Sequence, residues 1–433
     1  MKFRNAAALM LTVAMLAGCT SQGNAGNAPA QTAQATTAAT EAAQTEAADT
    51  EAAAESEKEA ETTAAETTAE ETTAAETAAP EEKKDLARSG EVRDIKPAEL
   101  VAELKIGWNL GNSLDATGNS GVLTEMAWGN PKTTQEMIDA INEKGFNTIR
   151  IPVTWDGHLG AAPDYKIDEK WMERVQEVVN YAIDDDMYVI LDSHHEENWR
   201  IPDDAHIDEV CKEVSAIWTQ IAENFRDYGD HLILEGLNEP RVKGSPEEWS
   251  GGKPEGWRCV DQMNQAFIDA VRSTGGNNEK RLLLVTTYAS SSVNKAMMKV
   301  TIPEDEHIAF SIHAYTPYAF TYANGESWEL FDWDGSRDGE IDALFSDLKK
   351  YFLDKDIPVI LTEFGAVNKN GNDAEVANWV TKYLTTAKEN GVPCVWWDNG
   401  YYTSGNELFG IFDRHNCTWF TDTVVDAMMK VYE

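Results

Sequence analysis

Short, nearly continuous apolar runs recur eight times along the chain from Lys105 onward. They predict strands over residues 105–108, 148–151, 188–191, 232–235, 282–285, 308–311, 359–361 and 394–397. Runs without alternating polar positions indicate strands that are buried on both faces. Such strands are typical of a parallel sheet covered by helices.

The segments between these runs carry apolar residues at helical spacing. Helices are predicted over residues 134–144, 169–184, 210–225, 374–387 and 420–431, with only a short helix over 293–300. Eight β–α repeats favour an α/β fold of the (β/α)8 TIM barrel type with enlarged loops. An open doubly wound sheet is the alternative, but no GxGxxG turn follows the first strand.

Polar and aromatic residues follow the predicted strands at the point where each strand ends. The carboxyl ends of all barrel strands meet at one face, where the active sites of this fold lie. The candidate site residues on these strands or just after them are Asn109, Arg150, His194, His195, Asn238, Glu239, His313, Tyr315, Glu363 and Trp397. A single histidine after a strand is commonly structural, but seven strand ends of this kind predict a site.

Glu239 and Glu363 end two different strands and carry the predicted chemistry. Two carboxyl groups that flank one bond are the minimum machinery for hydrolysing a glycosidic linkage. One must stay protonated to donate to the leaving oxygen, and the other must be ionised. The guanidinium of Arg150 is suited to hold the second group as an anion.

Aromatic residues near the strand ends are candidates to stack on sugar rings, which present apolar C–H surfaces. Trp155, Trp199, Trp397 and Tyr315 are assigned this role. The neighbouring His194 and His195 suggest a metal site, but adjacent residues of a strand point to opposite faces and the spacing fits no usual zinc motif. The expectation is therefore no metal and no cofactor.

The N-terminal segment predicts export. Lys2 and Arg4 precede an apolar run over residues 6–16, and small residues follow directly before Cys19. Residues 1–19 resemble a lipoprotein signal peptide with a lipobox, in which Cys19 is lipidated; an ordinary signal peptide is the alternative. The expected location is extracellular, anchored to the cell surface by lipid or secreted, with no other membrane contact.

Residues 20–87 are rich in Ala, Thr and Glu and almost lack large apolar side chains, which predicts a disordered linker before a catalytic domain over 88–433. The net charge of −39 is only partly in this linker. A surface this acidic argues against nucleic acid and anionic polymers as partners and suits a neutral glycan.

The four remaining cysteines, Cys211, Cys259, Cys394 and Cys417, form no CxxC pair and have no metal-ligand spacing. Disulfides between them are permitted by export but not required. We expect a monomer.

Seven motifs at these strand ends together resemble those of glycoside hydrolase family 5, in the endoglucanase and xyloglucanase branch of clostridial and rumen bacteria. In strand order they are GWNLGN at 107–112, IRIPV at 149–153, HHE at 194–196, LNEP at 237–240, HAY at 313–315, TEFG at 362–365 and WWDNG at 396–400. The resemblance spans essentially all of residues 88–433 and does not extend to the linker.

The resemblance implies a retaining mechanism, with Glu239 as the acid/base and Glu363 as the nucleophile. It implies that Arg150 and Tyr315 hold Glu363 as an anion and that His313 lies close to Glu239. The remaining implied roles concern the sugar itself: Asn238 binds its 2-hydroxyl, His194 and His195 bind other hydroxyls, and Trp397 forms the platform at the cleavage point.

The substrate expected from this resemblance is a β-1,4-glucan of the cellulose type, cut internally. Xyloglucanase, lichenase and mannanase activities on the same scaffold are alternatives, because the loops that discriminate between polymers cannot be read from the pattern. A lipid-anchored glycan-binding protein without activity is the alternative from another class. That class does not require Glu239 and Glu363 together with Arg150, His313 and Tyr315.

Overall fold

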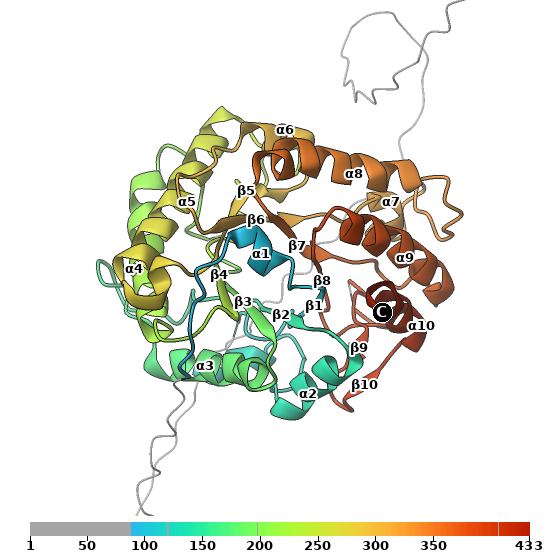
Figure 1. The fold of residues 1–433 in the computed structure, drawn as a ribbon, viewed down its shortest axis with the longest axis horizontal. Coiled ribbons are helices and arrows are strands. Elements are labelled where there is room, and N and C mark those ends of the chain that lie inside the picture. Colours follow the sequence, from blue (N-terminus) through green and yellow to red (C-terminus); the bar gives the residue numbers. More distant parts are fainter. Residues whose placement is uncertain (1–87, 119–120, 197, 406) are drawn as a thin grey trace, which may run out of the picture. The chain divides into compact units, whose positions relative to one another are not determined.

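The structure is a computed structural model that describes residues 88–118, 121–196, 198–405 and 407–433. The predicted signal peptide with Cys19, at 1–19, and the predicted linker, at 20–87, lie outside these residues. In the described part, eight strands form a closed barrel in the order β1 to β8, and β8 pairs with β1 (Figure 1). Each neighbouring pair is parallel, which confirms the prediction of a TIM barrel.

Each predicted strand is present, with ends that differ by a few residues. The barrel strands are β1 (Ile106–Asn109), β2 (Thr148–Ile151), β3 (Tyr188–Asp192), β4 (Leu232–Glu235), β5 (Leu283–Ser291), β6 (Ile308–His313), β7 (Val359–Phe364) and β8 (Cys394–Trp396). The extension of β5 contains Ala289 and Ser290 at positive φ, and its pairing with β6 shifts register before Ser291. This irregularity lies at the end of the strand that faces the site.

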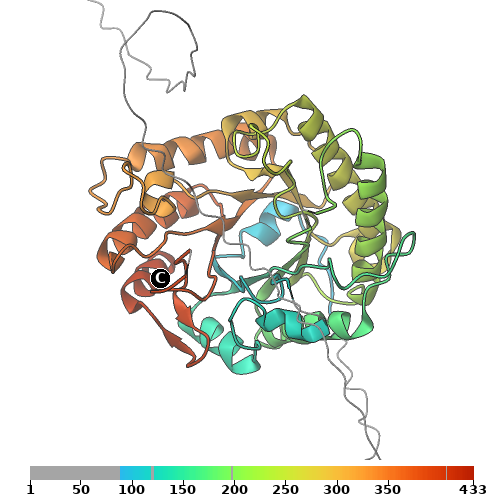
Figure 2. The ribbon, with the colours of Figure 1, turned by 180° about the vertical axis from the view of Figure 1, so that it is seen from behind.

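Helices surround the barrel and cover the outer face of its sheet (Figure 2). They are α2 (Gln135–Lys144), α3 (Glu169–Asp184), α4 (Ile207–Asn224), α5 (Pro254–Ser273), α6 (Asn294–Lys299), α7 (Tyr318–Thr321), α8 (Asp338–Tyr351), α9 (Asp373–Glu389) and α10 (Asp422–Tyr432). A short hairpin of β9 (Phe412–Asp413) and β10 (Thr418–Trp419), which the apolar pattern did not predict, follows β8. Within the described residues, no helix is both long and apolar enough to cross a bilayer.

One end of the barrel is closed by the helix α1 (Pro97–Val101), which overlies the strands in Figure 1. Leu100, Val101 and Leu104 form one buried cluster with residues on the strands. The other members of this cluster are Tyr188, Ile190, Ile233, Leu284, Ala309, Ile360 and Val395 on the strands, and Leu282 directly before β5. This apolar cluster closes one end of the barrel, so the site lies at the opposite end.

The cysteines occupy ordinary packing positions. Cys211 lies on α4 and Cys394 on β8, as the sequence predicts, and Cys259 lies on α5. All four cysteines of the described residues are free thiols. The permitted disulfides therefore do not form among them, and the barrel is held by its apolar core.

Candidate active site

The site is built around the side chain of Arg150, which is fully buried inside the barrel. Its guanidinium donates to both carboxylate oxygens of Glu235, at 2.7 and 3.0 Å, and to Oε1 of Glu363 at 2.8 Å. It also pairs with Asp192 and donates to Oδ1 of Asn238 at 2.9 Å. Side chains from β3, β4, β7 and the loop after β4 are thus held by one planar cation, whose several donors suit this geometry.

The electrostatic balance of this cluster follows from one cation among three carboxylates. Burial by itself would lower the pKa of Arg150, but Asp192, Glu235 and Glu363 raise it well above its usual value. Burial raises the pKa of Glu363, a change that His313 and Arg150 oppose. Burial also raises the pKa of Asp192. Arg150 is therefore permanently charged, and it limits the cost of ionising Glu363 in this buried place.

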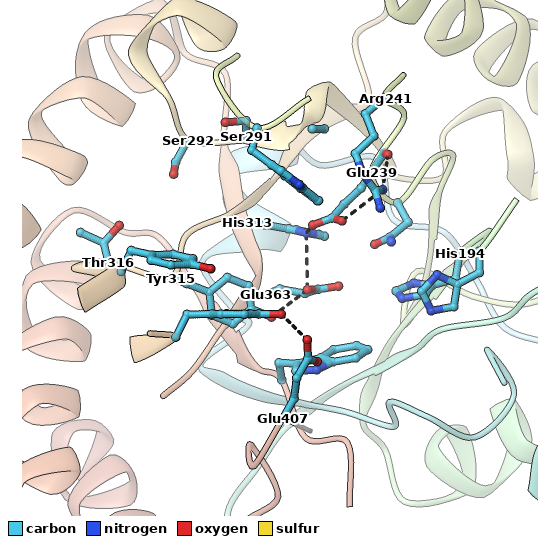
Figure 3. A pocket seen from close by; sticks show the side chains of 17 residues that line it. His194, Glu239, Arg241, Ser291, Ser292, His313, Tyr315, Thr316, Glu363 and Glu407 are labelled. Carbon is cyan, nitrogen blue, oxygen red and sulfur yellow. Dashed lines mark hydrogen bonds and ion pairs between the residues drawn. The ribbon is translucent and has the colours of Figure 1, made fainter. Parts of the chain in front are cut away.

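Glu239 and Glu363 lie close together, as Figure 3 shows. Nδ1 of His313 lies 2.8 Å from Oε1 of Glu239 and 3.5 Å from Oε2 of Glu363. One carboxylate oxygen of each glutamate and a ring nitrogen of His313 all lie within 4.8 Å of one another. Burial lowers the pKa of His313, so the ring is neutral at pH 7 and can donate to only one acceptor through Nδ1.

Tyr315 completes the contacts of Glu363. Its hydroxyl donates to Oε2 at 2.9 Å. Burial and the neighbouring Glu363 raise the pKa of Tyr315 well above its usual value, so it remains a donor. Both oxygens of Glu363 thus accept hydrogen bonds, which favours the ionised form.

The two predicted asparagines take different positions. Asn109 is fully buried and links β1 to β7 and β2, donating to the carbonyl of Thr362 at 2.9 Å and accepting from Arg150 at 3.1 Å. It supports Arg150 and does not line the cleft. Asn238 does line the cleft, and because its oxygen accepts from Arg150, its NH2 group is the part of the amide that can donate to a ligand.

Both predicted histidines reach the cleft. The ring of His194 lies parallel to Trp397, with centroids 5.6 Å apart, and its Nδ1 lies 2.8 Å from Asp192. The ring of His195 contacts Trp128 at 5.4 Å. The expectation that the two side chains point to opposite faces is wrong, because β3 ends at Asp192 and the strand geometry ends with it.

The cleft has a volume of about 610 Å³ and aromatic walls. Trp397 and Tyr315 line it as the sequence predicts, together with Trp249, Tyr318 and Tyr322. Trp155, predicted to stack on a sugar, is fully buried and directs its Nε1 to the carbonyl of Asp192, so that prediction is wrong. Trp199 is half-buried beside Arg200 and is not among the lining residues.

Asp192 and Glu235 are site residues to which the sequence reading gave no role. They are partners in register on β3 and β4, and both contact Arg150. The parity of positions along β3 could have pointed to Asp192. Ile190 aligns with Arg150, and Asp192, two residues further along the strand, shares the face of Ile190. Arg241 and Glu407 also line the cleft, but they lie in loops, where no periodic pattern of apolar residues indicates their position.

Two groups in the described residues bring three metal-ligating side chains within 4.8 Å. One is Asp115 with His194 and His195, and the other is Glu239 with His313 and Glu363. The ligand atoms already pair within the protein: Asp115 accepts from the backbone N–H groups of residues 112 and 113, and Nδ1 of His313 lies 2.8 Å from Glu239 and 3.5 Å from Glu363. Hydrogen bonding accounts for both groups, and the expectation of no metal stays a prediction.

Comparison with known proteins places this geometry in a family. Residues 111–403 match the family model for cellulase (glycosyl hydrolase family 5). Endoglucanase A of Ruminococcus albus is 68% identical over 347 residues, which cover 80% of this chain and 95% of that protein.

Two solved structures share the fold at substantial identity. A xyloglucan-specific endo-β-1,4-glucanase from a metagenomic library, in complex with cellotriose, is 46% identical with a TM-score of 0.75, covering 77% of this chain and 98% of that one. A broad-specificity endoglucanase from Ruminococcus champanellensis with bound cellotriose is 43% identical with a TM-score of 0.76, covering 78% and 100%. The chain is a glycoside hydrolase, and it belongs to the cellulase family, glycosyl hydrolase family 5.

Proposed function

We propose that this chain is an endo-acting β-1,4-glucanase that hydrolyses its substrate with retention of configuration. The observation that carries the mechanism is the approach of Glu239 and Glu363, whose nearest carboxylate oxygens lie within 4.8 Å. Retaining glycosidases hold their carboxyl groups about 5–5.5 Å apart, whereas inverting enzymes need about 6.5–9.5 Å to admit a water. The contact through His313 favours the shorter spacing.

In the proposed first step, ionised Glu363 attacks the anomeric carbon and forms a glycosyl ester, while Glu239 gives its proton to the leaving oxygen. In the second step, Glu239 takes a proton from a water that attacks the same carbon and releases Glu363. Arg150 and Tyr315 donate to the two oxygens of Glu363, which fixes the orientation of its carboxylate. His313 restrains Glu239 through Oε1.

Endo-cleavage of a β-glucan is supported by the relatives. The curated relative is named an endoglucanase, and both solved neighbours contain cellotriose. The cleft has aromatic walls, and the chain carries a large negative charge, which suits a neutral polymer. Xyloglucan is the second candidate substrate, because one of these neighbours is xyloglucan-specific.

We further propose that Cys19 is lipidated and that the linker at 20–87 connects this anchor to the catalytic domain. The support is the basic, apolar and small-residue order of the first 19 residues. The enzyme would then act at the cell surface on polymers outside the cell.

The test is the release of reducing ends from carboxymethyl cellulose, barley β-glucan, xyloglucan and glucomannan by the purified chain. Wild-type protein is compared with Glu363→Ala and with the isosteric Glu363→Gln, after equal unfolding midpoints have been established. We expect turnover on the glucans, ranked by rate, and its loss in both variants. Turnover that persists in either variant, or no turnover by wild-type protein on any polymer, would refute the proposal.

A further inference from the structure

The end of β5 nearest the site departs from regular strand geometry. Regular pairing with β6 stops after Thr286 and resumes only at Ser291. The residues between them, 287–290, form what we call the β5 bulge, in which Ala289 and Ser290 have φ of 57° and 48°. Bulges next to active sites commonly direct particular groups towards the site.

The backbone of the β5 bulge is strained, because left-handed φ is uncommon for residues that carry a side chain. Glycine adopts this conformation without the same cost. Within the described residues, Ala289 and Ser290 are the only two adjacent non-glycine residues with positive φ. Ser290 is fully buried and has a hydroxyl group, which glycine lacks. The strain is therefore compensated by contacts that the bulge makes.

Two of these contacts hold the backbone on both sides of Glu239. The Ser290 hydroxyl donates to the carbonyl of Asn238, and the Ala289 N–H donates to the carbonyl of Pro240 at 3.0 Å. The two acceptors belong to the residues directly before and after the proposed acid/base. The position of the Glu239 backbone is thus set by β5 as well as by its own strand.

A third contact extends this grip, and the β5 bulge is itself fixed. The buried Tyr288 accepts from the N–H of Val242 at 2.9 Å through its hydroxyl. The Thr286 hydroxyl donates to Oγ of Ser290 at 2.7 Å, and Asn264 of α5 donates to the Thr286 carbonyl at 2.8 Å. The bulge therefore connects the loop after β4 to a buried part of the barrel.

The side chain of Asn238 is held from another direction. Its Oδ1 accepts from Arg150 at 2.9 Å, and its backbone N–H donates to the carbonyl of Ser193 at 3.2 Å. A change in the β5 bulge should therefore leave the Asn238 amide in place and act mainly on Glu239, the next residue.

From these contacts we propose that the β5 bulge positions the Glu239 carboxyl for proton transfer, with Ser290 and Tyr288 as positioning residues. Ser291, where the bulge ends, pairs with His313, whose Nδ1 contacts the Glu239 carboxylate (Figure 3). The backbone and the side chain of Glu239 are thus both held from β5 and β6. Proton transfer to the leaving oxygen depends on such placement. This inference rests on the proposed glucanase function and extends it to two buried residues that do not line the cleft.

The test compares two substrates that differ only in their leaving group. Phenyl β-cellotrioside has a poor leaving group that needs a proton, whereas the 2,4-dinitrophenyl analogue releases a stable anion without one. Because kcat/KM reports the steps up to formation of the glycosyl-enzyme, it includes the step in which Glu239 is the proposed acid. The variants, made in the full chain, are Ser290→Ala, Ser290→Gly and Tyr288→Phe, with Glu239→Ala as the reference for complete loss of the acid.

We expect Ser290→Ala to lower kcat/KM on the phenyl substrate about tenfold, as the loss of one buried hydrogen bond would, and to change the dinitrophenyl value less than about twofold. Ser290→Gly should show the same contrast, although glycine suits the left-handed backbone, because the hydroxyl is what it lacks. Tyr288→Phe removes a different contact of the same bulge and should act in the same direction. It keeps the test independent of whether the Ser290 variants fold.

The matched control is Ser215→Ala. The Ser215 hydroxyl, on α4, also donates to a backbone carbonyl of another element, that of Ala266 on α5 at 3.4 Å, and Ser215 does not line the cleft. Its removal should alter kcat/KM on neither substrate.

Equal losses on both substrates would overturn the inference, because a distorted or partly unfolded site affects them alike. Unchanged hydrolysis of the phenyl substrate by Ser290→Ala and Tyr288→Phe would also overturn it. A failure of the underlying function has a different signature, since wild-type protein would then consume neither substrate and Glu363→Ala would make no difference.

Discussion

Arg150 holds Glu363 in place: Nη1 donates to Oε1 at 2.8 Å, and the Arg150 side chain is fully buried. Asp192 and Glu235 share the same guanidinium, so three carboxylates depend on one cation. Burial raises the pKa of Glu363 and Arg150 opposes that rise. The ionisation of Glu363, which the proposed mechanism requires, is therefore favoured by a residue of β2, a strand on another part of the barrel.

Arg150→Lys should lower kcat/KM by at least about 100-fold, equivalent to ~2.7 kcal/mol of transition-state stabilisation. Lysine keeps the charge, but one ammonium cannot bridge Asp192, Glu235 and Glu363 in a fixed plane. The unfolding midpoint should also fall, because carboxylates remain buried without their full set of partners. Steady-state kinetics on β-glucan and a thermal unfolding curve measure the two effects.

Arg174→Lys is the matched control. Arg174 is also buried, and it pairs with Glu125 and Glu177 outside the barrel interior. Its replacement should lower the unfolding midpoint and leave kcat/KM unchanged below that midpoint. If the Arg150 variant behaved in the same way, Arg150 would be a structural residue and its role in positioning Glu363 would be wrong.

The pH profile should respond to Tyr315. In the proposed mechanism Glu363 must be ionised to attack, so we expect activity to be lost as the pH falls through its pKa, which burial has raised. The Tyr315 hydroxyl favours the ionised form, and Tyr315→Phe should therefore raise that pKa further and move the acidic limb of kcat/KM to higher pH. At the acidic end, kcat/KM should fall about tenfold relative to wild type, as expected for the loss of one hydrogen bond to a charged group.

Tyr383→Phe provides the comparison for this profile. Tyr383 is a buried tyrosine whose hydroxyl donates to the carbonyl of Ala314 at 2.8 Å. Its loss removes a buried hydrogen bond without touching a glutamate, so the acidic limb should stay in place. A profile of Tyr315→Phe that falls uniformly at all pH values would show that Tyr315 does not act on ionisation.

The sequence predicted the barrel and most of the site, because strand ends mark positions that converge in space. Each strand was found as an apolar run; Arg150 and Trp397 lie within such runs, and Glu239, His313, Tyr315 and Glu363 follow them within a few residues. Burial on both faces and a fixed strand order leave little freedom in where such residues lie.

Other site features could not be read in this way. Trp155 follows a strand but is buried, because the direction of a side chain just past a strand depends on tertiary packing. Arg241 and Trp249 meet in an irregular loop whose path no period reveals. The alternation of side chains along β3 and β4 could have placed Asp192 and Glu235 on the same face as Arg150, but only a structure shows that both contact its guanidinium.

The proposed lipid anchor predicts that cells expressing the full chain incorporate a labelled fatty acid into it and retain it in the membrane fraction. Cys19→Ser should abolish both, because the thiol is the acceptor. Cys417→Ser, which removes a half-buried thiol of the catalytic domain, should change neither. An ordinary signal peptide would instead give unlabelled, released protein from wild-type and variant chains alike.

Removal of the proposed acid/base gives the sharpest test of the proposed double displacement. Glu239→Ala should reduce kcat on β-glucan about 10²–10⁴-fold, the range for loss of general acid–base catalysis, and should reduce it far less on a substrate with a good leaving group. Azide is a small anion that needs no general base, so it should occupy the vacated space and restore part of the turnover. The product should be a β-glycosyl azide, because Glu363 has already inverted the anomeric centre once.

Glu363→Ala supplies the complementary result under the same conditions. Without a nucleophile on that side, azide can only attack the anomeric carbon directly with Glu239 as the acid, which gives an α-glycosyl azide from a β-glycosyl fluoride. The two variants should therefore produce azides of opposite configuration, readily distinguished by proton coupling constants. If Glu239→Ala gave an α-azide, the roles proposed for the two glutamates would be wrong. If neither variant gave an azide, the result would contradict the retaining mechanism, which the short distance between Glu239 and Glu363 supports.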